Sequence, residues 1–388
     1  MPSRTNSRAL FSRRVVALCG FALAVAMLSL FFGSASAAAD RADEIYSQRF
    51  FQSATLLADG RVLVAGGLKG SATLDDAGVF DPKTGAWSPA GHLQTARANH
   101  TATRLSDGRV LVAGGCADNC MAAVANAEIY DPATNQWRGT APLSTARWFH
   151  FAVLLSDGRV LAGGGDGSSG ALASTEIYDV GKGVWSQAPA LSAARALATA
   201  TVLRDGNVLA IGGSAQHQAL ASAEVFDVTR KRWAFVNPMA TARQEPRAVL
   251  LADGDVLISG GDESAGNRVV AAERYMVSSG IWTPTADPKI GRSHHTATLL
   301  VDGSVLVAGG IGTGGDALSS TQLYDPVKNS WKDGGALSTP RKFHSAVQLA
   351  DGRVLMIGGF VGQGLSLGTK SELYDPLAPH RSGSASPR

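Results

Sequence analysis

Seven arginines recur at equivalent positions along the chain, and arginine is well suited to binding anions. Each lies ten residues before an Asp-Gly pair. A ring of them would form an anion-binding funnel for a carboxylate or a sulfated sugar, because guanidinium groups pair bidentately with such ligands. The alternative is that recurring glutamates neutralise them inside the fold, and the regularity of both series favours this. The arginines are Arg49, Arg97, Arg147, Arg195, Arg243, Arg292 and Arg341, and the glutamates are Glu128, Glu176, Glu224, Glu273 and Glu372.

The glutamate series is interrupted twice. Gly78 and Gln322 occupy its positions in the first and sixth repeats. We therefore expect an arginine near one of these repeats to be less completely neutralised.

The two residues after each arginine vary, whereas the frame around them does not. Trp148 and Phe149 could stack on a sugar or grip a peptide, although packing inside the fold would use them equally well. Glu245, His294 and Phe343 occupy the same kind of position. The candidate ligand-binding residues are Arg49, Arg97, Arg147, Trp148, Phe149, Arg243, Glu245, Arg292, His294, Arg341 and Phe343.

Four histidines lie three residues after the arginine of their repeats: His100, His150, His295 and His344. A metal site needs three or four ligands within about 2 Å of one ion, whereas one histidine per repeat would be spread around a ring. Histidines hydrogen-bonded within strands are the alternative. We expect neither a metal nor a cofactor.

These residues are spaced from a strand-forming stretch that occurs seven times. Its second copy, residues 107–115, reads as an Asp-Gly hairpin turn, an apolar run and a Gly-Gly pair. Three further segments complete that repeat: residues 97–105, residues 127–132 and the region of Trp137. The pattern predicts four antiparallel strands, A to D, with strand B apolar on both faces. Such sheets, packed between neighbouring sheets, form the blades of a propeller.

The fixed spacings resemble the kelch repeat. In six repeats an aromatic residue of strand C lies seven residues before a tryptophan, as in Tyr130 and Trp137, and follows the Gly-Gly pair. The likeness is to the exported bacterial kind of kelch protein and implies an all-β, seven-bladed propeller. Kelch proteins include binding platforms, copper oxidases and sugar mutarotases, so the resemblance does not fix a function. The chain lacks the Tyr-His pair and free cysteine expected of a copper radical oxidase.

The strand count predicts how the ring closes. The sequence contains seven copies of strands A, B and C but six tryptophan-bearing D strands. We expect residues 40–47 to form strand D of blade seven; otherwise that blade has three strands and an exposed edge. The predicted propeller spans residues 38–376, followed by a disordered tail at 377–388.

Residues 1–37 have the pattern of an export signal. Four arginines precede an apolar run at residues 15–32, and Ser34-Ala-Ser-Ala37 resembles a cleavage site. An uncleaved leader would instead be the only membrane anchor. We expect a monomer in the periplasm or outside the cell, in which Cys116 and Cys120 form a disulfide.

Charge argues against a nucleic-acid partner. Removing residues 1–37, which carry four arginines and no acidic residue, changes the formal net charge from +3 to −1. No strongly basic field then remains to neutralise phosphates.

Two functions remain open. Loop lengths vary in the B–C connections, which share one face with the D–A connections, and this face predicts a binding or scaffold module for a glycan or a protein. The alternative is a carbohydrate-active enzyme, such as a mutarotase or epimerase, that uses Glu245, Arg243 and His295 for proton transfer. A galactose-oxidase-like activity is the less favoured form of that alternative.

Overall fold

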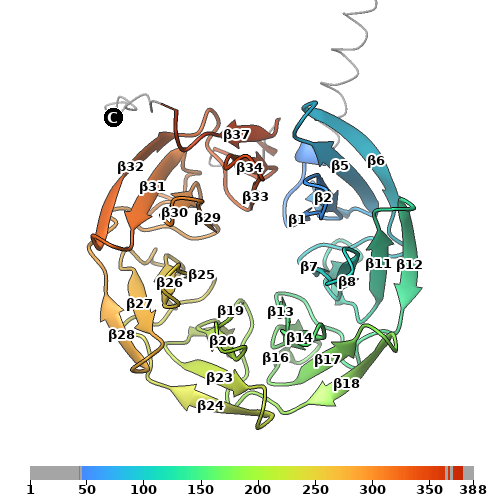
Figure 1. Ribbon diagram of the computed structural model, residues 1–388, viewed down its shortest axis with the longest axis horizontal. Coiled ribbons are helices and arrows are strands. Elements are labelled where there is room, and N and C mark those ends of the chain that lie inside the picture. The colour runs from blue at the N-terminus through green and yellow to red at the C-terminus, as the bar shows by residue number, and fades with distance from the viewer. Residues whose placement is uncertain (1–42, 44–45, 363–365, 368–369, 379–388) are drawn as a thin grey trace, which may run out of the picture.

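Seven antiparallel sheets surround a central axis (Figure 1). This computed structural model describes residues 43, 46–362, 366–367 and 370–378. The predicted leader and most of the predicted tail lie outside the described residues. Among the residues that are described, no helix is long and apolar enough to cross a membrane.

The strands follow the predicted A-to-D order in each blade. Six sheets have four strands, and the seventh has three among the described residues. Blades one to three are β1 (Ser53–Leu56), β2 (Val62–Ala65), β5 (Asp76–Asp81) and β6 (Ala86–His92); β7 (Thr101–Arg104), β8 (Val110–Ala113), β11 (Ala127–Asp131) and β12 (Gln136–Thr140); and β13 (Phe151–Leu154), β14 (Val160–Gly163), β17 (Thr175–Asp179) and β18 (Val184–Ala188). Blades four and five are β19 (Thr199–Val202), β20 (Val208–Ile211), β23 (Ala223–Asp227) and β24 (Arg232–Val236); and β25 (Arg247–Leu250), β26 (Val256–Ser259), β27 (Glu273–Met276) and β28 (Ile281–Pro284). Blades six and seven are β29 (Thr296–Leu299), β30 (Val305–Ala308), β31 (Ser320–Asp325) and β32 (Ser330–Ala336); and β33 (Ser345–Gln348), β34 (Val354–Ile357) and β37 (Glu372–Tyr374).

Several B–C connections contain a short hairpin. Each of these hairpins consists of two strands of two residues. They are β3 (Leu68–Lys69) with β4 (Ala72–Thr73), β9 (Cys116–Ala117) with β10 (Ala122–Ala123), β15 (Asp166–Gly167) with β16 (Gly170–Ala171), β21 (Ser214–Ala215) with β22 (Gln218–Ala219), and β35 (Phe360–Val361) with β36 (Ser366–Leu367).

The hydrophobic core is divided into clusters that neighbouring blades share. Every B strand is buried along its length because both of its faces meet other blades. Leu63 of blade one, for example, packs in one cluster with Val110 and Val112 of blade two. Each blade therefore completes its core only when its neighbours are present.

The aromatic residue and the tryptophan seven positions later form a cross-strand pair. Tyr130 of β11 lies opposite Trp137 of β12, with ring centroids 5.1 Å apart. The Trp137 Nε1–H group also donates to the carbonyl of Ala90 in the preceding blade, at 2.8 Å. The conserved spacing within the repeat thus stabilises both a blade and its contact with the previous blade.

The Gly-Gly pair allows close approach to the next blade. Gly114 and Gly115 have φ angles of 63° and 99°, which favour glycine. Gly115 N–H donates to the Arg147 carbonyl at 2.8 Å, and a Cβ atom on Gly114 would lie 2.6 Å from that same oxygen. A side chain at Gly114 would therefore push blades two and three apart.

The predicted closing strand is wrong for the described part of residues 40–47. Asp43, Tyr46 and Ser47 are helical, and Ser47 Oγ donates to the Asp43 carbonyl at 2.6 Å. The Asp43 carboxylate accepts from Trp87 Nε1 of blade one at 2.9 Å and from Ser371 Oγ of blade seven at 2.6 Å. A helical turn with one carboxylate thus supplies to Trp87 the acceptor that Ala90 of β6 supplies to Trp137.

The innermost strands close the ring. Strand β1 contacts β33 where blades one and seven meet, at the top of Figure 1. Gly359 N–H donates to the Arg49 carbonyl at 2.8 Å, the same contact that Gly115 makes with Arg147. Gln52 Nε2 also donates to the Ile357 carbonyl at 2.9 Å. The first and last blades therefore join much as any two neighbours do.

Candidate functional site

The repeated arginines are buried inside the blades rather than exposed at the central mouth. Arg97 is 0% exposed, and its guanidinium lies 2.7 Å from Glu128 and 2.9 Å from the Gly114 carbonyl. Glu128 also accepts from the backbone N–H groups of Gln94 and Thr95. The pair thereby fixes the D–A connection against strand C. The same pairing joins Arg147 to Glu176, Arg195 to Glu224, Arg243 to Glu273 and Arg341 to Glu372.

The two interruptions of the glutamate series have local causes. A Cβ atom on Gly78 would lie 2.5 Å from Cδ1 of Tyr46, so this ring takes the place of a glutamate side chain. Asp76 pairs with Arg49 instead, at 2.6 Å.

In blade six the D–A connection presents an acceptor rather than N–H donors. Gln322 can donate to the Pro288 carbonyl through Nε2 while accepting from Arg292 at 2.9 Å, which a carboxylate cannot do. Burial lowers the pKa of Arg292 to about 10. The expectation of a less neutralised arginine is therefore met in blade six, where Arg292 faces a neutral glutamine. It is not met in blade one, where Asp76 neutralises Arg49.

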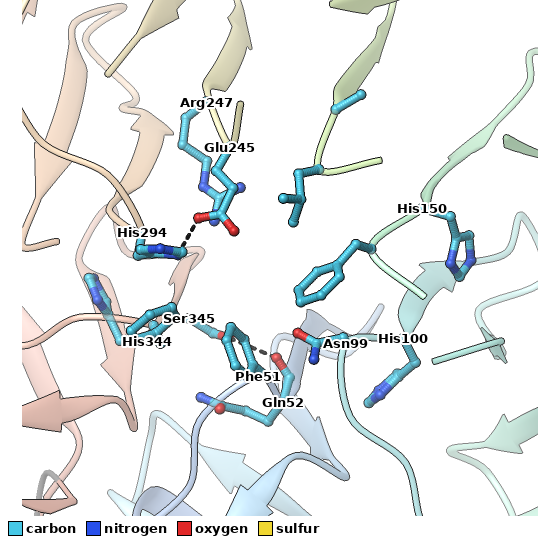
Figure 2. A pocket seen from close by; sticks show the side chains of 14 residues that line it. Phe51, Gln52, Asn99, His100, His150, Glu245, Arg247, His294, His344 and Ser345 are labelled. Carbon is cyan, nitrogen blue, oxygen red and sulfur yellow. Dashed lines mark hydrogen bonds and ion pairs between the residues drawn. The ribbon is translucent and has the colours of Figure 1, made fainter. Parts of the chain in front are cut away.

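The second residue after each arginine faces the central mouth. All seven have positive φ angles, from 48° to 59°, and all line a cavity of about 240 Å³ (Figure 2). Neighbouring blades are linked here, since the N–H of Asn99 donates to the Phe51 carbonyl at 3.1 Å and that of Leu197 to the Phe149 carbonyl at 3.0 Å. This left-handed geometry turns the side chain inward. The seven mouth residues are Phe51, Asn99, Phe149, Leu197, Glu245, His294 and Phe343.

Three phenylalanines form one wall of the cavity, which we call the phenylalanine wall. The Phe51 ring centroid lies 4.8 Å from that of Phe343 and 6.0 Å from that of Phe149, in edge-on arrangements. Trp148 packs behind Phe149 at 5.1 Å and does not line the cavity. Trp148 therefore supports the wall rather than forming it.

Blades five and six provide a polar wall formed by Glu245, Arg247 and His294. His294 Nδ1 pairs with the Glu245 carboxylate, as Figure 2 shows. Arg247 Nε donates to the His295 carbonyl at 2.9 Å. Burial lowers the pKa of Arg247, and the nearby Glu245 charge opposes this shift. The mouth thus carries both signs of charge on one side and aromatic rings on another.

The polar wall does not fit a metal ion well. Glu245, Asp262 and His294 bring potential ligand atoms within 4.8 Å of one another. Asp262 is already paired with Arg268 at 2.6 Å, and burial raises its pKa. With Arg247 beside Glu245 as well, two arginines offset the two carboxylates, so these groups present no net negative charge to attract a divalent cation.

The four histidines lie immediately before strand A of their blades rather than within it, and they are hydrogen-bonded to neighbouring blades. His150, His295 and His344 are buried, and His100 is half-buried. His150 Nε2 lies 3.0 Å from Thr101 Oγ1, and His344 Nε2 lies 3.1 Å from Thr296 Oγ1. Burial, together with the charge of Arg97, lowers the pKa of His100 to about 3. These histidines are therefore neutral at ordinary pH and do not converge on one point.

Four of the candidate residues chosen from the sequence lie at the mouth. Phe149, Glu245, His294 and Phe343 line the cavity. Of the residues expected to transfer protons, Arg243 is paired with Glu273 and His295 bonds to Ser259 at 3.2 Å, and neither lines it.

Arg247 was missed, although the sequence contained a signal. Four residues after the motif arginine, the other blades carry small hydroxyl residues in all but one case. Those equivalents are Ser53, Thr101, Phe151, Thr199, Thr296 and Ser345. A half-buried arginine in such a series breaks the repeat at the mouth.

Cys116 and Cys120 form the expected disulfide, which ties the B–C hairpin of blade two. Cys116 is fully buried, next to Ala98. Both sulfurs are thus engaged in a structural bond at the rim of the mouth.

Two models of known protein families match this chain. The model of the KLHDC2/KLHL20/DRC7 kelch-repeats domain matches residues 54–261, and the kelch motif model matches residues 291–338. The chain belongs to the kelch-repeat family. No curated protein sequence matched this kelch protein.

A solved structure shares the propeller fold. It is a fungal alcohol oxidase of the AA5 family in complex with copper, 18% identical, with a TM-score of 0.70 over 85% of this chain and 75% of that one. Identity at this level shows the fold alone. Among the described residues, those that line the mouth include no tyrosine or cysteine and do not fit a copper radical centre.

Proposed function

We propose that this kelch propeller is a binding module that holds a sugar residue of a glycan at its central mouth. The observation that carries the proposal is one cavity with a phenylalanine wall and a polar wall. A pyranose ring has matching chemistry, because C–H groups cover its faces and hydroxyl groups surround its rim. Aromatic rings and a few placed polar groups are typical of small-ligand sites.

The backbone of the mouth favours binding because hydrogen bonds between neighbouring blades hold it in place. Glu245 N–H donates to the Leu197 carbonyl at 2.8 Å, and Phe343 N–H donates to the His294 carbonyl at 3.2 Å. A backbone fixed in this way loses little conformational entropy when a ligand binds. The proposal includes export to the periplasm or beyond, on the sequence of residues 1–37 alone, and a monomeric protein.

One observation favours a second candidate function. Glu245 and His294 form an acid–base pair inside the cavity. Such a pair could move a proton during the mutarotation or epimerisation of a bound sugar. This alternative uses His294 in place of the His295 and Arg243 expected from sequence.

The test is a calorimetric titration of the purified protein with a panel of monosaccharides and oligosaccharides. Phe149→Asn removes one ring of the wall, and Asn99 at the equivalent position of blade two shows that asparagine accepts this backbone. We expect a loss of affinity of about tenfold. Phe235→Asn, at a side chain 56% exposed on β24, is the matched control and should bind like the wild type.

Two results would contradict the proposal: no sugar binds, or Phe149→Asn binds as well as the wild type. Capture of a protein ligand in place of any sugar would likewise reject the glycan. NMR spectra of the same samples would report anomer exchange. Exchange that is faster than in buffer and lost in Glu245→Gln would favour the enzyme.

A further inference from the structure

Arg247, in the polar wall of the candidate site, differs in chemical type from most residues at the equivalent position of the other blades. Threonine occupies the equivalent position in the blades on either side, at Thr199 and Thr296. Arg247 is the first residue of β25, and its side chain extends into the cavity beside Glu245 (Figure 2). A charged side chain has thus replaced a short hydroxyl group at the point where a ligand would lie.

The contacts of Arg247 leave most of its donors available. Its Nε–H group donates to the His295 carbonyl at 2.9 Å. Among the described residues, no acceptor is hydrogen-bonded to its two terminal nitrogens, and no carboxylate lies within 4.0 Å of them. Glu245 has the nearest opposite charge, but its carboxylate is engaged with His294.

The motif arginines show what this fold does with a structural guanidinium. Arg195, which is fully buried, pairs with Glu224 at 2.8 Å and with the Gly212 carbonyl at 2.8 Å. Burying a guanidinium without such partners is costly. Arg247 is half-buried and has one carbonyl in place of this full set, so its terminal nitrogens are available to an anion that enters the cavity.

We propose that Arg247 binds a carboxylate and that the mouth recognises an acidic sugar, a hexuronate residue. This inference rests on the proposed function, since it names the class of sugar held at the same site. A guanidinium binds a carboxylate through two parallel hydrogen bonds. The sugar ring then lies on the phenylalanine wall, and its hydroxyl groups meet the remaining polar side chains.

Glu245 gives the ligand a direction. Its carboxylate repels that of the ligand and accepts hydrogen bonds from hydroxyl groups. The acidic end of the sugar is therefore directed toward Arg247, and the hydroxyl groups are directed toward Glu245, His294 and Asn99.

The experiment compares acidic and neutral sugars of matched stereochemistry. Galacturonate and glucuronate oligosaccharides, and their galactose and glucose counterparts, are titrated into the wild type and Arg247→Thr. Threonine is the residue that three other blades carry there, so this variant should fold, and its melting temperature checks that it does. Arg232→Thr, with the same loss of charge at an exposed position of β24, is the control.

We expect the wild type to prefer the uronate. The ratio of uronate to neutral-sugar affinity should fall about 30-fold in Arg247→Thr, which is the range for a charged hydrogen-bonded pair, and should stay at the wild-type value in Arg232→Thr.

The outcomes separate this inference from the function on which it rests. Equal affinity of the wild type for acidic and neutral sugars would overturn the role of Arg247 while leaving sugar binding in place. A uronate preference that survives in Arg247→Thr would do the same. No binding of any sugar would overturn both. Binding of an acetylated tripeptide through its free C-terminal carboxylate, in preference to the sugars, would reject the hexuronate.

Discussion

At the scale of single residues, the histidines at equivalent positions of the repeat are held by hydrogen bonds to the preceding blade. The Nε2 atoms of His100 and His150 bond to hydroxyl groups of the preceding blade, at 2.9 and 3.0 Å. Their Nδ1 atoms are buried without a hydrogen-bond partner. Burial and neighbouring arginines lower the pKa of both residues, His100 to about 3 and His150 well below 6.5. The neutral ring is thus the form that fits.

This arrangement predicts that the protein loses stability in acid. The unfolded chain binds protons at these histidines below a pKa of 6.5, whereas the folded protein does not until about pH 3 at His100. The free energy of unfolding should therefore fall as the pH drops from about 6.5, by up to about 1.4 kcal/mol per pH unit for each histidine.

Guanidinium denaturation at pH 7, 6 and 5 measures that slope. His150→Gln should make the slope shallower, because it removes one of the groups that take up a proton on unfolding. The variant should fold, since blade one carries Gln52 at the equivalent position. An unchanged slope in His150→Gln would show that other groups cause the acid sensitivity.

At the scale of elements, the helical turn before the first blade replaces a missing strand. The Tyr46 ring is 7% exposed and stacks on Trp87 with centroids 5.4 Å apart. It belongs to a cluster that also contains Val62 of blade one and Val347 of blade seven. One aromatic side chain thus covers the junction of the two blades.

We expect Tyr46→Ala to lower the free energy of unfolding by about 3 to 5 kcal/mol, the usual cost of removing a buried aromatic ring. Tyr46→Phe, which keeps the ring, should remain close to the wild type. Chemical denaturation followed by tryptophan fluorescence gives both values.

A double-mutant cycle tests the cause of the Gly78 interruption. Gly78→Ala should destabilise the wild type but cost less in Tyr46→Ala, because the added Cβ atom would meet the Tyr46 ring. Additive effects of the two substitutions would contradict this account.

At the scale of the whole molecule, stability is shared around a closed ring. Seven of the hydrophobic clusters join adjacent blades, including the cluster that joins blade seven to blade one. The Arg49 carbonyl and Gln52 side chain add hydrogen bonds across that last junction. No blade has a core that it could keep alone.

The protein should therefore unfold in one cooperative transition. Far-ultraviolet circular dichroism and tryptophan fluorescence should give the same midpoint in guanidinium. Deleting residues 339–388, which removes blade seven, should abolish the folded state rather than leave six stable blades. Separate transitions, or a stable truncated protein, would show that groups of blades fold independently.

The sequence by itself determined the propeller, because its signals are local and repeated. An Asp-Gly turn, a strand that is apolar on both faces, a Gly-Gly pair and a cross-strand pair such as Tyr130 and Trp137 act within one blade or between neighbours. Repeating them seven times left little freedom in the architecture. The glutamate series likewise indicated that the motif arginines are paired internally.

Only the tertiary structure decided which side chains reach the mouth and how the ring closes. The motif arginine turns into its blade, while the residue two positions later turns inward through a positive φ angle that its sequence position does not reveal. Phe51, Glu245 and Arg247 meet in one cavity although about 200 residues separate the first from the others. Such convergence depends on the closed ring, and so does the Asp43 contact that replaces the expected strand.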